Sequence, residues 1–296
     1  MPNAPAPPHF SPGGALAACH AAVALFGFAG LFGKWMAWDP VAIVLGRTAV
    51  AAFVLAFVVR WRMGGIRPLH VGMIVNGIFL AVHWVAFFAA IRVSTVAIGL
   101  LGYASFPLFV PFLERWVLGI AVTPRKLAGA GLVALGLVLL VPEFSWQSHT
   151  VRGLAWGVLS GLTFALLTVR TRRLSPERWS SEMALWQNAT AAVCVLPIVL
   201  WQGGVGGPID ASEIGKVLLL GVVCTALAHS LYTASLARLP ASTVSVCAAL
   251  EPVYGIVLAV ALLHEVPDVR TMAGALLLVV AAIVASWRAR AAAPMP

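Results

Sequence analysis

Two stretches of sequence decide the fold. Residues 83–107 read HWVAFFAAIRVSTVAIGLLGYASFP, and residues 229–252 read HSLYTASLARLPASTVSVCAALEP. In each stretch a His lies nine residues before an Arg, an apolar run rich in small residues follows, and a Pro ends it. Apolar sequence of this length with so few charges indicates helices that cross a lipid bilayer. The matching landmarks indicate that the chain repeats itself.

The composition of the whole chain is that of a membrane protein. Of its 296 residues, 61% are hydrophobic and only 10% are charged, whereas about 25% of the residues of a soluble domain are charged. The net charge of +9 is scattered in short Lys and Arg clusters between apolar runs, which argues against a nucleic-acid partner. The four Cys lie in apolar runs without Cys-x-x-Cys spacing, so they indicate neither a disulfide frame nor a metal site.

Ten apolar runs are candidate membrane spans. They cover approximately residues 15–35, 40–60, 69–91, 95–118, 125–141, 153–170, 181–201, 214–236, 241–263 and 269–287. With the N-terminus inside, thirteen Lys and Arg lie on the cytoplasmic side and five on the outer side, so we expect both termini to be cytoplasmic. The Pro-rich residues 1–14 lack the basic stretch of a signal peptide and predict a disordered tail. Residues 289–296 predict a second cytoplasmic tail, and the whole chain a multi-pass protein of the cell (inner) membrane.

The two halves keep the same order of landmarks along their length. Arg125 with AGA at residues 128–130 corresponds to Arg270 with AGA at residues 273–275, at a constant offset. Each unit, residues 15–142 and residues 152–288, holds five spans, so the second unit enters the membrane from the opposite side. An inverted five-plus-five repeat is a recurrent architecture of secondary transporters. Chance alignment of Ala-, Leu- and Val-rich segments is the alternative.

Three short motifs in the second half carry a family resemblance. Residues 249–255 read ALEPVYG, residues 262–265 read LLHE and residues 272–275 read MAGA. The chain resembles, over nearly its whole length, the EamA-type members of the drug/metabolite transporter superfamily, and within it the YddG-type exporters of aromatic and other amino acids. The first half departs from the pattern, because Ile120 stands where the matching Glu would be. The resemblance implies a transporter, not an enzyme.

Matched prolines predict broken helices in the two stretches quoted above. Pro107 and Pro252 lie near the bilayer midplane, and Pro111 adds a second break to the first of these spans. Each Pro removes a backbone donor and disturbs the carbonyl four residues earlier. An unsatisfied carbonyl in hydrocarbon costs several kcal/mol, so we expect these helices to line a central cavity. An ordinary helix kink is the alternative.

Polar and aromatic side chains inside the spans are the candidate lining of this cavity. Arg47 and Glu251 are the deepest charges, and ionisable groups at this depth usually face the bundle interior. Arg47 could recognise a substrate carboxylate and Glu251 could bind a proton; the alternative is a structural pair between them or with the backbone. The other candidates are His83, Trp84, Phe87, Tyr103, Trp186, Gln187, His229 and Tyr232. Aromatic walls with a few polar tips suit an amphipathic solute of amino-acid size. Plain packing is the alternative, and for each His a hydrogen bond to a neighbouring helix.

The motifs that the chain lacks narrow the function further. It has no phosphate-binding loop, which argues against ATP-driven pumping, and no His-Glu-x-x-His or Ser/His/Asp arrangement. We expect no cofactor. Two His without acidic neighbours do not predict a metal site. Gly153, Gly157 and Gly161 predict close helix packing, within the fold or in a homodimer.

The sequence therefore predicts an all-α secondary transporter, surrounded by membrane lipid, that exports amino acids, aromatic and other small amphipathic ones. A broad-specificity drug/metabolite exporter is the first alternative. Nucleotide sugars would need several basic cavity residues to bind their phosphates, and only Arg47 is available. A membrane-embedded lipid-modifying enzyme has little support, since no acid/base pair can be assembled from the spacing, and a scaffold without transport is the blandest option.

Overall fold

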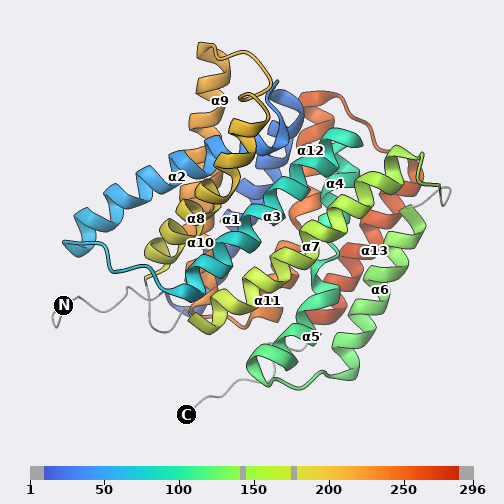
Figure 1. Ribbon diagram of the computed structural model, residues 1–296. Helices are drawn as coiled ribbons and strands as arrows, with labels where there is room; N and C mark the ends of the chain where they lie inside the picture. Colours follow the sequence, from blue (N-terminus) through green and yellow to red (C-terminus); the bar gives the residue numbers. More distant parts are fainter. Residues whose placement is uncertain (1–9, 141–144, 175–178, 287–296) are drawn as a thin grey trace.

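The protein is a bundle of helices (Figure 1). The computed structural model describes residues 10–140, 145–174 and 179–286, and every regular element within these ranges is a helix. The elements are α1 (Pro12–Trp35), α2 (Pro40–Met63), α3 (Val71–Val93), α4 (Val96–Tyr103), α5 (Phe106–Leu118), α6 (Pro124–Leu140), α7 (His149–Leu174), α8 (Ser180–Trp201), α9 (Ala211–Gly221), a π-helical turn (Val222–Leu227), α10 (Ala228–Leu236), α11 (Ala241–Ala248), α12 (Glu251–Leu263) and α13 (Val269–Ser286).

Within the described residues, eight helical runs are long and apolar enough to cross a membrane, which makes the chain a multi-pass membrane protein. They are Pro12–Trp35, Pro40–Arg62, Val71–Val93, Val96–Leu118, His149–Leu174, Ser180–Trp201, Ala211–Leu236 and Ala241–Leu263. Two shorter apolar helices, Lys126–Leu140 and Val269–Ala281, fall on the remaining predicted spans. The last residues of those two spans, the unit boundaries at residues 142 and 288, and the tail 289–296 lie outside the described residues.

The first helix begins earlier than the sequence predicts. Residues 1–9 of the predicted tail lie outside the described residues, but residues 12–14 form the first turn of α1, so the predicted tail is too long there. Ser11 caps this turn: its Oγ accepts a hydrogen bond from the Gly14 N–H at 3.1 Å. Pro12 occupies the first helical position, where its missing N–H has no intrahelical partner to lose.

Two of the long runs are interrupted near their middle. α4 ends at Tyr103 and α5 begins at Phe106, while α11 ends at Ala248 and α12 begins at Glu251. Pro107 and Pro252 therefore stand in the first turn of α5 and α12, where proline is well tolerated. By contrast, α5 continues through Pro111, so the break predicted there is wrong. Proline inside a helix removes one backbone hydrogen bond, and here the helix carries that loss without ending.

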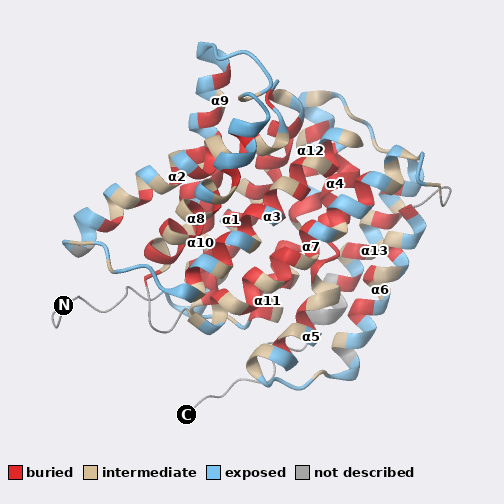
Figure 2. Cartoon of the chain, viewed as in Figure 1, coloured by how far each residue is buried: buried red, intermediate tan, exposed pale blue. Residues whose placement is uncertain are grey.

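The core lies where helices of the first half pack on helices of the second (Figure 2). α3 packs on α7 as α10 packs on α1, and α5 packs on α7 as α12 packs on α1. α2 contacts α8, and α6 contacts α13. Exchanging the two halves, with each element replaced by its counterpart in the predicted repeat, turns this set of neighbours into itself.

Glycines allow two of these helix pairs to approach closely. A Cβ added at Gly157 on α7 would lie 2.7 Å from the Gly102 Cα on α4, and one added at Gly27 on α1 would lie 2.9 Å from the Gly255 nitrogen on α12. No side chain can occupy such a space, because real Cβ contacts are longer. Gly153 and Gly161 pack, like Gly157, on the stretch of residues 94–106. The small-residue stripe of α7 thus packs within the chain.

Candidate functional site

A cavity lies at the centre of the bundle, beside both helix interruptions. Tyr103, the last residue of α4, and Glu251, the first of α12, both line it, so the interrupted ends meet there. Its full lining is Phe26, Ala29, Arg47, Leu80, His83, Trp84, Phe87, Tyr103, Phe164, His229 and Glu251. Seven of the ten side chains singled out from the sequence are in this set: Arg47, His83, Trp84, Phe87, Tyr103, His229 and Glu251.

The other three predicted residues lie elsewhere. Tyr232 packs behind the lining, with its ring centroid 5.3 Å from that of Phe164 and its hydroxyl 2.8 Å from Thr168 Oγ1. Trp186 Nε1 donates to the Arg67 carbonyl at 3.2 Å, at the edge of the bundle. Gln187 Nε2 donates to Thr171 Oγ1 on α7 at 3.0 Å. The sequence places Trp186 and Gln187 inside a span, but it does not reveal which face of α8 points towards the cavity.

Four lining residues were not predicted from the sequence: Phe26, Ala29, Leu80 and Phe164. Each is apolar and lies in an apolar span, so nothing in its type or spacing separates it from a packing residue. Phe164 is the most central of them, since its ring centroid lies 4.8 Å from that of His83 and 5.2 Å from that of Tyr103. The aromatic wall of the cavity therefore joins α3, α4 and α7.

Arg47 is held in place by the π-helical turn. Its side chain is 1% exposed, Nε donates to Thr225 Oγ1 at 2.9 Å, and Nη2 donates to the Cys224 carbonyl at 3.2 Å. A π turn widens the helix and is frequent at functional sites; here Thr225 donates in turn to the carbonyl five residues back, Leu220, at 2.7 Å. The guanidinium carbon lies 3.9 Å from the centroid of the Trp84 ring. Such a desolvated cation–π contact is worth about 2 kcal/mol.

Glu251 is the second buried charge and has an oxygen to spare. The residue is 3% exposed, and its Oε2 accepts no hydrogen bond from any described residue. Within the described ranges no ion pair joins Glu251 to Arg47. The sequence left two structural roles open for these charges, a pair with each other or bonds to the backbone. Among the described residues, only the second is present, and only for Arg47. Buried charges without counter-ions are expensive, so both groups remain available to a charged solute.

Each cavity histidine is bonded to a neighbouring helix through its Nδ1. His83 Nδ1 lies 3.1 Å from the Ser160 carbonyl and 2.8 Å from Ser160 Oγ, both on α7. His229 Nδ1 lies 3.0 Å from Asn188 Nδ2, whose orientation is fixed by its bond to the Ala184 carbonyl at 2.8 Å. His229 Nδ1 therefore accepts, and its proton is on Nε2. The cavity thus combines two ionisable side chains, Arg47 and Glu251, with two imidazoles.

The cavity is closed around very little space. Its free volume is about 20 Å³, which is room for about one water molecule. Any larger solute has to push the lining side chains and helices apart. The structure therefore corresponds to a state in which the site has no room for an amino acid.

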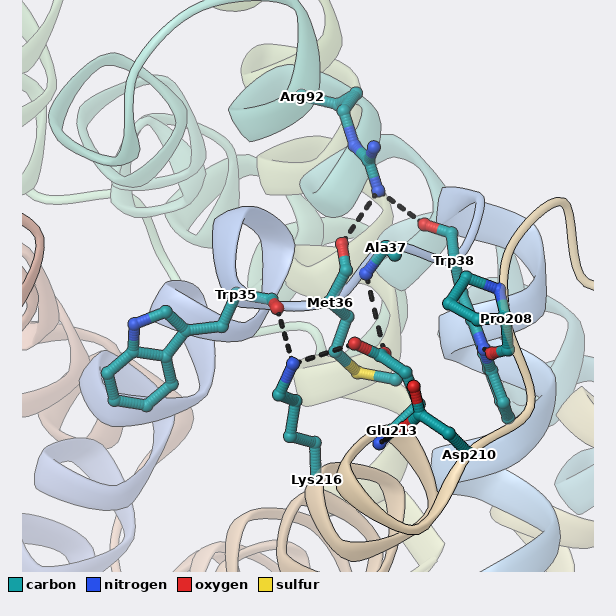
Figure 3. A network of polar contacts seen from close by, with 9 residues as sticks. All are labelled: Trp35, Met36, Ala37, Trp38, Arg92, Pro208, Asp210, Glu213 and Lys216. Carbon is teal, nitrogen blue, oxygen red and sulfur yellow. Dashed lines mark hydrogen bonds and ion pairs between the residues drawn. The ribbon is translucent and has the colours of Figure 1, made fainter.

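A polar network joins α9 to the turn between α1 and α2 at one end of the bundle (Figure 3). Arg92, in the last turn of α3, donates to the Trp38 carbonyl in that turn. Lys216 of α9 donates to the Trp35 carbonyl at 2.9 Å and forms an ion pair with Glu213 at 2.7 Å. These bonds tie the start of the second half's α9 to the end of the first half's α1.

Comparison with known proteins agrees with this architecture. Residues 13–141 and residues 151–287 each match the EamA-like transporter family. The pseudopaline exporter CntI of Pseudomonas aeruginosa, in strains UCBPP-PA14 and PAO1, is 29% identical over 249 residues, which are 82% of this chain and 85% of that protein. A solved structure described only as a crystal structure of a protein has the same fold, with a TM-score of 0.73 and 21% identity over 95% of this chain and 99% of that chain. The family resemblance seen in the sequence is thus confirmed: the chain belongs to the EamA-like transporter family of the drug/metabolite transporter superfamily, and it is a transporter and not an enzyme.

Proposed function

We propose that the chain is a secondary transporter that exports amino acids, aromatic and other small amphipathic ones, across the cell (inner) membrane. The observation that carries the proposal is the pair of buried, mutually unpaired charges, Arg47 and Glu251, in one aromatic-lined cavity. A zwitterion supplies the counter-charge that each of them lacks. Its carboxylate binds Arg47, its ammonium binds Glu251, and its side chain lies against the aromatic rings.

His229 supports the same class of solute, because its Nε2–H donates a hydrogen bond, as a carboxylate requires. A purely apolar drug would leave Glu251 Oε2 without a partner, and burying such a group without one costs free energy. The polar groups of the cavity therefore favour an amphipathic zwitterion over an apolar compound.

Alternating access around two inverted five-helix units is the transport mechanism that we propose. Three observations support it: the helix neighbours are equivalent when the halves are exchanged, the family matches twice along the chain, and the interruptions occur in matching spans. With an odd number of spans in each unit, residues 15–142 and 152–288 face the membrane in opposite senses, and both termini are cytoplasmic. Two such halves pack in two nearly equivalent ways, one opening the cavity inward and the other outward.

Export as the direction of transport draws support from the relative CntI, which is an exporter of pseudopaline. The same relative favours a second candidate, in which the solute is a larger metabolite and the specificity is broader. The two candidates differ in what the cavity accepts once it opens. Competition by unlabelled compounds of increasing size separates them.

Counterflow into proteoliposomes tests the proposal directly. Purified protein is reconstituted, the vesicles are loaded with unlabelled Phe, Met or Thr, and uptake of the same labelled amino acid is measured. Protein-free vesicles and vesicles with the Arg47→Ala variant are the controls. Uptake above both controls, saturable and inhibited by other amino acids, is the expected result. Absence of uptake for every amino acid, in a preparation whose thermal unfolding is cooperative, overturns the substrate class. Reporter fusions at each terminus test the predicted topology separately.

A further inference from the structure

The two interrupted runs touch each other on both sides of the cavity. Towards one end of the bundle α4 packs on α12, and towards the other end α5 packs on α11 (Figure 1). The cavity lies between these two contacts, because Tyr103 ends α4 and Glu251 begins α12. A solute that leaves the cavity past the interrupted runs has to separate one contact or the other.

Each of the two contacts carries a carboxylate bound to the start of the opposing helix. Glu265, just after α12, accepts a hydrogen bond through Oε2 from the Val96 N–H at 2.9 Å, and Val96 is the first residue of α4. Glu114 on α5 accepts one through Oε1 from the Ser242 N–H at 3.0 Å, in the first turn of α11. The first N–H groups of a helix have no intrahelical acceptor, and a negative charge beside them is stabilising.

These bonds differ from ordinary helix caps because they join the two halves of the chain. Thr95, the local cap of α4, accepts from the Ile98 N–H at 3.1 Å and leaves the Val96 N–H to Glu265. Glu114 is 1% exposed, and its second oxygen pairs with Lys126 at 2.7 Å. Glu114 thus supplies in the first half the carboxylate that the sequence comparison expected at Ile120.

We propose that Glu114 and Glu265 are the two gate latches of the transporter, each holding one mouth of the cavity shut. The proposal rests on the alternating-access function proposed above. Opening the α4–α12 mouth breaks the Glu265–Val96 bond, and opening the α5–α11 mouth breaks the Glu114–Ser242 bond. Both bonds are present here, in the state whose cavity has no room for an amino acid. In the orientation inferred from the loop charges, Glu265 closes the outer mouth and Glu114 the cytoplasmic one.

Accessibility of a reporter cysteine in the cavity tests the latches. Ala29 lines the cavity and is 2% exposed, so Ala29→Cys reports when a mouth opens. The rate of its modification by a membrane-impermeant maleimide is measured from the outer side in right-side-out vesicles and from the cytoplasmic side in inside-out vesicles. The same protein without Ala29→Cys provides the background from the native cysteines.

Removing a latch is expected to shift accessibility to one side only. Glu265→Met should raise the outer labelling rate about tenfold and lower the cytoplasmic rate, and Glu114→Met should do the reverse, because a charge-assisted hydrogen bond shifts an equilibrium by about tenfold or more. Glu→Gln at either position keeps an acceptor oxygen and should restore part of the wild-type ratio. Asp268→Ala is the matched control, since its carboxylate accepts from the Thr271 N–H at 2.7 Å at the start of its own helix, α13; it should leave the ratio unchanged.

Opposite shifts by the two variants support the latches, whichever way round the chain sits in the membrane. Equal increases on both sides indicate general loosening and overturn the proposal, as does an unchanged ratio in both variants. The assay needs no substrate, so a protein that fails to transport amino acids in proteoliposomes still gives an answer here. The failure of the proposed function and the failure of the latches are therefore distinguishable.

Discussion

Replacing Arg47 with Met removes the positive charge of the cavity and keeps an apolar side chain of similar length. If Arg47 binds the solute carboxylate, the variant loses charged hydrogen bonds worth about 1.5–3 kcal/mol, which is roughly a 10- to 150-fold weaker binding of Phe. The folded protein also loses the bonds to Thr225 and Cys224 and the contact with the Trp84 ring. Against these losses, Met avoids the cost of burying a charge, which is several kcal/mol. The expected net change in the free energy of unfolding is therefore small, within about 2 kcal/mol.

A pair of related ligands separates carboxylate recognition from a general disturbance of the site. Phe carries both charges, and 2-phenylethylamine carries the same ring and ammonium without the carboxylate. Binding of each is measured by isothermal titration calorimetry on wild-type and Arg47→Met protein, with thermal unfolding in detergent as the check on folding. The variant should weaken the binding of Phe and leave that of the amine almost unchanged. An equal loss for both ligands would refute the assignment, because it would mean that Arg47 acts only by shaping the cavity.

Three further substitutions follow from the same geometry. Glu251→Gln should weaken binding of Phe and 2-phenylethylamine by roughly tenfold and spare 3-phenylpropionate, which has no ammonium group; calorimetry with the three ligands decides this, and weakened binding of 3-phenylpropionate would count against it. Gly157→Ala places a Cβ 2.7 Å from the backbone of α4 and should destabilise the protein by about 1–3 kcal/mol, which is measured as a lower Tm. Gly131→Ala is the control, because a Cβ there meets nothing within 4 Å and should leave the Tm unchanged. Equal Tm values for the two variants would contradict the packing argument. Trp186→Phe should leave counterflow rates unchanged, because its Nε1 bonds only to the Arg67 carbonyl, outside the cavity lining, and a large loss of uptake would place Trp186 on the solute pathway after all.

The membrane character and the candidate charges could be predicted because lipid imposes strong constraints. Apolar runs of the required length locate the spans. A charge inside a span has to face the interior, and Arg47 and Glu251 do line the cavity, as this rule predicts. Matched prolines located the interruptions at Pro107 and Pro252. The break predicted at Pro111 was wrong, because a proline within a helix removes a single hydrogen bond and need not end the helix.

The rotational setting of each helix could not be predicted. A span that is apolar on all sides has no distinct face, so Trp186 and Gln187 were assigned to a cavity that α8 turns them away from. For the same reason Phe26 and Phe164 gave no signal, although both line the cavity. The bonds that hold the site in shape join residues between 41 and 178 positions apart, and no local pattern predicts them.

The π-helical turn has a consequence for how the run Ala211–Leu236 is anchored. Its first part, α9, is fixed by the Glu213–Lys216 pair against the α1–α2 turn, and its last part, α10, is fixed by the bond between His229 and Asn188. The wide turn between them absorbs the angular mismatch that a uniform α-helix would impose on these two anchors. Deleting a single residue from 222–227 would leave a run long enough to span the membrane, yet it would rotate α10 by about 100° and carry His229 away from Trp84. An insertion or deletion in this turn therefore changes the direction in which the polar side chains of α10 point, while the run stays long enough to cross the membrane.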